Sequence, residues 1–184
     1  MRMEKTLTPD TLLDGARMYA AAADAINNKL PNSLHVLSHI IATSIELALK
    51  AYLHHNKYTE KQLRKFGHNL QELLQEACKV GFEYTGSKNF VLSVSGYNYR
   101  ERLFVYPENG QMNIIMPWRL RQIANEIIIE VYSSIFGESQ YDANSSQQGL
   151  FVDSSYPEDI DASNWASSNK KMYLTRKRSG KLGR

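Results

Sequence analysis

The sequence predicts an all-α fold, an up-and-down bundle of four to five helices with a small β-hairpin inserted before the last helix. Apolar residues recur at helical spacing in several segments, capping residues precede those segments, and one Pro-Glu-Asn-Gly turn signal separates two short apolar runs. With 184 residues, 42% of them hydrophobic, the chain can build one domain with a sizeable core but not two. We expect that domain to span residues 1–137.

Two long helices are predicted before residue 56. The first begins at Thr8-Pro9-Asp10, which supplies an N-cap, a proline at the first helical position and an acidic first turn, and it runs to about Ile26. The second begins near residue 32 or 33 and ends at residues 54–56. Over half of its circumference is apolar, so we expect it to be central. Its polar residues occupy about 100° of arc: His35, His39, Thr43, Glu46, Lys50 and His54.

Shorter elements follow. Thr59 with Gln62 predicts a short helical turn, and Asn69 with Glu72 starts another helix that ends near Gly81. Residues 87–99 fit a strand or a helix, and we favour a helix. Residues 103–106 and 112–115 flank the turn at 107–110 and predict the hairpin. The last helix starts at Pro117 and ends before Gly137, with this apolar stripe: Leu120, Ile123, Ala124, Ile127, Ile128, Val131 and Ile135.

The charge of +3 conceals two opposed blocks after residue 137. Residues 1–137 carry 15 Lys/Arg and 13 Asp/Glu (+2), residues 138–169 carry six acidic and no basic residues (−6), and residues 170–184 carry seven basic and no acidic ones (+7). The acidic block also holds eight serines. We therefore predict a polar tail over 138–184, acidic and Ser-rich to 169 and basic from 170.

Composition also excludes several classes of protein. The sequence has no run of 18 apolar residues and no recognisable secretory signal at its start, so we expect a cytoplasmic protein that does not span a membrane. The single cysteine, Cys78, excludes an internal disulfide and any site that needs several thiolates, and its apolar neighbours favour a small core residue over a nucleophile. We expect no metal ion and no cofactor.

Two short motifs resemble the HEPN superfamily of helical bundles. They are E-L-A-L-K-A-Y-L at residues 46–53 and, after a loop, G-H-N-L at residues 67–70, which opens the next helix. The specific part covers about 40 residues within 8–136. The resemblance implies a helical bundle that usually dimerises, found in prokaryotic defence, toxin–antitoxin and RNA-processing systems. Many active members are metal-independent ribonucleases.

The chain departs from that family at the motif associated with ribonuclease activity. The motif is an arginine followed, after four to six residues, by a histidine near the start of a late helix, and this chain has no histidine after His68. Its nearest counterpart is Arg119 with Asn125, whose amide cannot serve as a general acid or base. Arg64 and His68 are too closely spaced. The resemblance therefore implies the fold more strongly than the activity, and we lean away from an enzyme.

The candidate catalytic residues are His35, His39, Glu46, Lys50 and His68, and each has a structural alternative. Two histidines four apart on a helix can chelate a metal, but no third ligand is at hand, and histidines at the surface or the edge of the core are favoured. Glu46 and Lys50 form either an ordinary i,i+4 pair that orients the central helix or part of an acid–base site. His68 either caps the following helix or transfers a proton.

Basic residues supply the candidate nucleic-acid contacts. Arg100, Arg102, Arg119 and Arg121 lie among Tyr97, Tyr99 and Tyr106, a combination that suits phosphates and unpaired bases, although an ordinary solvated face remains the alternative. The tail adds further candidates: Lys170, Lys171, Arg176, Lys177 and Arg178. Two alternatives for the basic block are pairing with the acidic block and an unstructured end that aids solubility. Apolar residues in the linker also allow the tail to dock on the bundle or on a partner.

The leading hypothesis is a non-catalytic HEPN-like domain, a homodimer, that acts as a nucleic-acid-associated or regulatory component of a prokaryotic defence or stress system. The alternatives are a divergent metal-independent ribonuclease that uses the polar stripe or the arginines, and an adaptor that binds a cognate protein partner.

Overall fold

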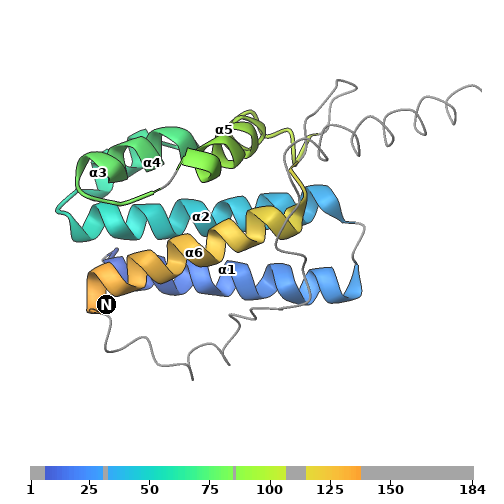
Figure 1. Ribbon diagram of the computed structural model, residues 1–184, viewed down its shortest axis with the longest axis horizontal. Coiled ribbons are helices and arrows are strands. Elements are labelled where there is room, and N and C mark those ends of the chain that lie inside the picture. The colour runs from blue at the N-terminus through green and yellow to red at the C-terminus, as the bar shows by residue number, and fades with distance from the viewer. Residues whose placement is uncertain (1–6, 31–32, 85, 107–114, 138–184) are drawn as a thin grey trace, which may run out of the picture. The chain divides into compact units, whose positions relative to one another are not determined.

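The computed structural model describes residues 7–30, 33–84, 86–106 and 115–137, which form six helices and no strand (Figure 1). The all-α class is therefore confirmed for this part of the chain. The helices are α1 (Pro9–Lys29), α2 (Leu34–His55), α3 (Glu60–Lys65), α4 (Leu70–Lys79), α5 (Gly86–Arg100) and α6 (Pro117–Phe136).

Most helix ends follow the local signals of the sequence. Thr8 and Thr59 each form a capping box, Asn69 accepts a hydrogen bond from the backbone N–H of Glu72, and Pro117 is the first residue of α6. These contacts satisfy backbone groups that the helix itself leaves unpaired. Gly81 follows α4 with φ +101°, the left-handed conformation that ends many helices.

The central helix is α2, as its apolar circumference predicts, because it contacts each of the other five helices. In Figure 1, α1 and α6 lie along one side of α2, and α3, α4 and α5 lie along the other. The largest fully buried side chains include residues of α1, α2, α4, α5 and α6: Leu13, Leu37, Ile41, Ile45, Leu49, Leu53, Leu70, Leu73, Leu92, Leu120 and Ile123.

Two glycines mark close approaches between helices. A Cβ atom at Gly15 of α1 would lie 3.3 Å from Leu47 Cδ1 of α2, and one at Gly96 of α5 would lie 3.3 Å from Leu70 Cβ, at the start of α4. Ser44 adds a polar contact by donating a hydrogen bond to the Ala16 carbonyl across the α1–α2 interface at 2.7 Å.

Two predictions need correction. Residues 103–106, the first strand of the predicted hairpin, form consecutive turns, because Leu103 donates its N–H to Asn98 O and Tyr106 donates its N–H to Arg102 O. The chain continues to coil there instead of extending. Cys78 is exposed rather than part of the core. The turn at 107–110, residues 112–114 and the tail 138–184 lie outside the described residues.

One described helix, α2, has the length and hydropathy of a membrane span. The core helix of a soluble protein has the same properties, and 67% of the most apolar window of α2 is buried inside the bundle.

Candidate functional site

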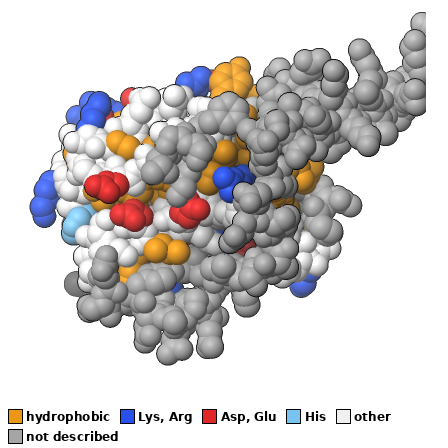
Figure 2. All heavy atoms as spheres, in the orientation of Figure 1, with side chains coloured by type: hydrophobic (Ala, Val, Ile, Leu, Met, Phe, Trp, Pro, Cys, Tyr) orange, Lys and Arg blue, Asp and Glu red, His pale blue; other side chains and the backbone are white. Residues whose placement is uncertain are grey.

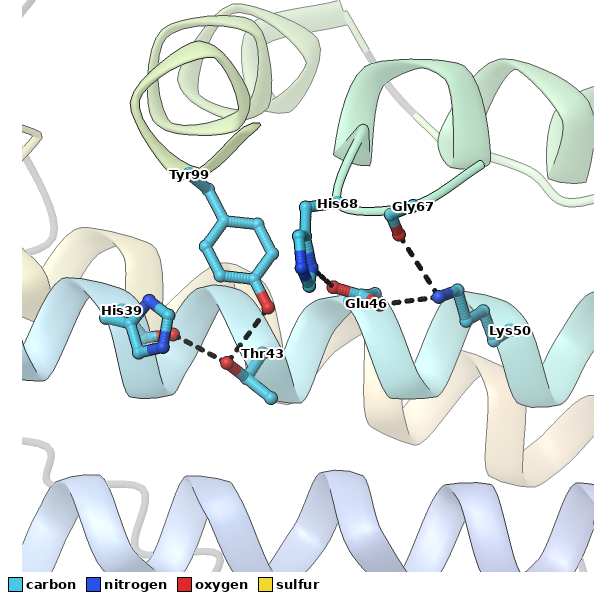
Figure 3. A network of polar contacts seen from close by, with 7 residues as sticks. All are labelled: His39, Thr43, Glu46, Lys50, Gly67, His68 and Tyr99. Carbon is cyan, nitrogen blue, oxygen red and sulfur yellow. Dashed lines mark hydrogen bonds and ion pairs between the residues drawn. The ribbon is translucent and has the colours of Figure 1, made fainter. Parts of the chain in front are cut away.

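Glu46 is the centre of a polar network on the side of α2 that faces α4 and α5 (Figure 3). The residue is 6% exposed, and both oxygens of its carboxylate accept hydrogen bonds. Oε1 accepts a hydrogen bond from Lys50 Nζ at 2.5 Å, and Oε2 lies 2.9 Å from His68 Nδ1. Because a carboxylate only accepts, His68 donates through Nδ1. We call His39, Thr43, Glu46, Lys50, Gly67, His68 and Tyr99 the Glu46 network.

The loop between α3 and α4 closes one side of the network. Lys50 donates a second hydrogen bond to the Gly67 carbonyl at 3.1 Å, so one ammonium joins the helix to the loop. Gly67 has φ +54°, a conformation that glycine adopts without strain. This conformation lets residues 67 and 68 present a carbonyl and an imidazole to α2, which explains physically why Gly-His precedes the Asn69 cap.

Helix α5 closes the other side through Tyr99, which is 3% exposed. Thr43 donates to the His39 carbonyl at 2.9 Å, and its hydroxyl lies 3.0 Å from the Tyr99 hydroxyl. The Tyr99 ring lies between two imidazoles, with centroids 5.3 Å from His39 and 5.1 Å from His68, as Figure 3 shows. Four sequence candidates, His39, Glu46, Lys50 and His68, thus belong to one network. The two histidine rings flank the buried Tyr99 phenol, and Lys50 lies on the far side of Glu46 from it (Figure 3).

Burial sets the protonation of two members. Burial lowers the pKa of His39 below its ordinary 6.5, the charge of His68 lowers it further, and Glu46 acts in the opposite direction. Burial, reinforced by the nearby Glu46 carboxylate, raises the pKa of Tyr99 well above its ordinary 10.0. Near neutral pH the Tyr99 phenol is therefore protonated, and His39 is a neutral imidazole.

His35 lies one turn before His39 and makes no hydrogen bond with the network. The Nδ1 atoms of His35 and His39 are buried without a hydrogen-bond partner among the described residues. Within the described part of the chain, no three His, Cys, Asp or Glu side chains are grouped so that they could hold a metal ion.

The four predicted arginines do not form one surface. Arg121 is buried between α6 and α1, where its Nε and Nη2 atoms donate to the two oxygens of Asp24 at 2.9 and 2.6 Å, and it also contacts Asn125. This bidentate pair joins two helices. Arg100, Arg102 and Arg119 are exposed. Arg119 contacts Gln122, one turn along its own helix, at 3.1 Å.

Sequence reasoning misplaced Tyr99 among the arginine-rich aromatics. Residues two apart on a helix lie about 200° apart around its axis, so Tyr97 and Tyr99 point to opposite sides. The structure follows this geometry, since Tyr97 is 56% exposed whereas Tyr99 is buried. The same angular argument, applied to the sequence, would have separated Tyr99 from Tyr97. The Asp24 partner of Arg121 has no comparable signal, because the two residues are 97 positions apart.

A cavity of about 540 Å³ lies apart from the network, between α4 and α5. It contains Cys78 and none of the network residues, and its lining is Gln71, Leu74, Gln75, Cys78, Lys79, Asn89 and Leu92.

Comparison with known proteins adds no assignment: no protein-family model, curated protein or solved structure matches this chain.

Proposed function

We propose that this protein is a non-catalytic HEPN-like helical domain that associates with nucleic acid, or regulates a partner, in a prokaryotic defence or stress system in the cytoplasm. The observation that carries the non-catalytic part is the closed Glu46 network, in which both carboxylate oxygens are already bonded within the protein.

A closed network favours a structural role. A general base needs an accessible lone pair near the proton that it removes. Glu46 is buried and divides its oxygens between Lys50 and His68, while Lys50 divides its donors between Glu46 and Gly67. These bonds join α2 to the loop before α4 and would have to break before a substrate could use them. The sequence also lacks the late arginine–histidine motif of active relatives in the family that it resembles.

Charge supports the nucleic-acid part of the proposal. The tail carries seven basic residues over 170–184, and the bundle adds the exposed Arg100, Arg102 and Arg119. Each neutralised phosphate releases counterions, so such a chain would bind RNA or DNA with an affinity that falls steeply as salt rises.

Incubation of the full chain with labelled RNA in EDTA tests both parts at once. Three proteins are compared: wild type, a His39→Ala/Glu46→Ala variant, and a chain that lacks residues 170–184. We expect binding without cleavage in the wild type and weaker binding without the tail. Cleavage by the wild type that the double variant abolishes, while circular dichroism shows the variant to be folded, would overturn the non-catalytic assignment.

A divergent metal-independent ribonuclease is the second candidate, and one observation favours it. The His68 side chain is 46% exposed while its Nδ1 is bonded to Glu46, so Nε2 is the ring nitrogen available to a substrate. A histidine oriented by a carboxylate in this way can act as a general base. If this candidate is correct, His68→Ala removes EDTA-resistant cleavage, whereas His55→Ala, at an exposed histidine, preserves it.

A homodimer and a cognate protein partner also belong to the proposal, from the resemblance alone. Sedimentation at several protein concentrations tests the dimer, and a 21 kDa species throughout would remove it. If RNA neither binds nor is cleaved, the adaptor role becomes the better proposal.

A further inference from the structure

The end of α5 and the turns after it carry an exposed surface of aromatic and basic side chains. Tyr97 is 56% exposed and Tyr106 is 64% exposed. Val105 and two arginines, Arg100 and Arg102, are exposed in the same stretch of ten residues. We call these five residues the Tyr97 surface. In Figure 2, hydrophobic and basic side chains are visible together at the upper edge of the molecule, over the layer that contains α5.

The backbone holds this surface in a defined shape. Glu101 donates its N–H to the Tyr97 carbonyl at 3.0 Å, which continues the helical winding, and Tyr106 donates its N–H to the Arg102 carbonyl at 2.9 Å. Phe104 is only 5% exposed and anchors the turn to the bundle. The backbone that carries the two exposed rings is therefore held by hydrogen bonds and by the buried Phe104 side chain.

The two arginines retain groups that can contact a ligand. Arg100 lies over the Tyr97 ring, 5.7 Å from its centroid, and donates Nε to Glu101 at 2.8 Å. Its terminal amino groups take no part in that bond. Arg102 is exposed and forms no ion pair with another described residue. Planar guanidinium groups bind phosphate oxygens, and exposed tyrosine rings stack on unpaired bases.

The backbone conformation of Arg102 provides a matched control position for tests of this surface. Its φ of +56° lies in the left-handed region, where a side chain causes strain that glycine avoids. Lys57 has the same features elsewhere, since it is basic and exposed with φ +71° in the turn after α2.

We infer that the Tyr97 surface binds single-stranded nucleic acid, with unpaired bases stacked on Tyr97 and Tyr106 and phosphates contacted by Arg100 and Arg102. The inference rests on the proposed function and places a nucleic-acid contact on the folded bundle in addition to the basic tail. A single strand is favoured over a duplex because only unpaired bases offer open faces to tyrosine rings. A protein ligand is less favoured because the surface has one aliphatic residue beside its rings and cationic groups.

Fluorescence anisotropy with two labelled probes tests this inference on the full chain. One probe is an unstructured RNA of roughly 12 nucleotides, a length within the usual range for such surfaces, and the other is a duplex of the same sequence. We expect the wild type to prefer the single strand. Tyr97→Ala/Tyr106→Ala should weaken single-strand binding roughly tenfold or more. Duplex binding, which needs only charge, should stay unchanged.

Two glycine variants separate the surface from general electrostatics. Arg102→Gly and Lys57→Gly each remove one positive charge and one strained backbone conformation, so both should fold at least as well as wild type. Arg102→Gly should weaken single-strand binding and reduce the slope of log affinity against log salt by about 0.7, the value for one phosphate contact. Lys57→Gly should retain both the affinity and the slope.

Other outcomes would overturn the inference. Equal binding of both probes, or unchanged single-strand binding by the double tyrosine variant, would assign the affinity to the tail and leave the proposed function standing. No binding of either probe would remove both proposals. If the tyrosine variant changes the sedimentation of the protein but not its RNA affinity, the surface is a protein interface. Circular dichroism on each variant verifies the fold.

Discussion

Tyr97 and Tyr99 belong to one turn of α5 and have opposite environments. Tyr99 is buried against α2, where its hydroxyl meets Thr43 and its ring lies between two histidines, whereas Tyr97 faces solvent beside Arg100. The Glu46 network and the Tyr97 surface thus combine similar residue types, aromatic and charged, only a few residues apart. The two regions differ in the burial of these residues and not in their type.

The difference between the two regions lies in what their polar atoms already bind. In the Glu46 network a buried carboxylate, an ammonium and an imidazole satisfy one another, which is the condition for a buried charge to be tolerated. On the Tyr97 surface, Arg102 has no ion-pair partner among the described residues and both rings are exposed. A closed set of bonds holds helices together, and an open set is available to a ligand.

The largest expected effect is at Glu46. Glu46→Gln removes the charge that balances Lys50, whose side chain is 14% exposed, and should lower the free energy of unfolding by about 3 kcal/mol. Urea denaturation measures this change. RNA binding should be unaffected once the variant is folded, because the network is separate from the Tyr97 surface.

The double variant Glu46→Gln/Lys50→Met is the control for that prediction. Removal of both charges should recover part of the loss, because no uncompensated ammonium remains. If Glu46→Gln instead retains full stability and loses RNA binding, the assignment of the two regions is reversed.

A smaller effect is expected at Arg121, the arginine that the sequence placed with the nucleic-acid contacts. Arg121→Gln breaks the bidentate pair with Asp24 between α6 and α1 and should reduce the free energy of unfolding by about 2 kcal/mol. The exposed Arg119→Gln is the matched control and should change stability by less than about 0.5 kcal/mol. An RNA-binding defect in Arg121→Gln at normal stability would return Arg121 to the binding surface.

The sequence alone could predict those features that depend on residues close together in the chain. Local signals were sufficient for the helices, because caps such as Thr8, Thr59 and Asn69 act within three residues, and six of the seven residues in the predicted apolar stripe of α6 are buried. They were also sufficient to nominate Glu46, Lys50 and His68.

Contacts between distant segments could not be predicted in the same way. The Arg121–Asp24 pair joins residues 97 positions apart, and nothing in the local sequence distinguishes a buried arginine from an exposed one. The prediction of a strand at 103–106 was wrong because a short apolar run fits a strand or a turn, and the backbone hydrogen bonds of Leu103 to Asn98 and of Tyr106 to Arg102 form turns there.

Two glycine substitutions test how firmly the helices behind each region are packed. Gly96→Ala should destabilise the protein by about 1 kcal/mol, since the new methyl group would meet Leu70 Cβ and the Gln71 backbone, which cannot move independently. Gly15→Ala should stabilise it by about 0.5 kcal/mol, because the flexible tip of Leu47 can yield and alanine favours the helix. Thermal melts of both variants measure the contrast, and equal signs would contradict it.

The smallest effect concerns His39 and the pH dependence of the Glu46 network. Burial, with the charge of His68, keeps the pKa of His39 in the folded protein below 6.5, its ordinary value and the one expected on unfolding. As pH falls from 6.5 through the lowered pKa, the unfolded chain takes up a proton that folded His39 resists, so stability falls with acidification in that window and is fully present above it. Urea unfolding of the wild type and His39→Gln at several values between about pH 5 and about pH 7.5 should show a shallower dependence in the variant. The exposed His55→Gln should keep the wild-type slope, because that histidine lies outside the network. An unchanged slope in His39→Gln would contradict the assignment of this pH dependence to His39.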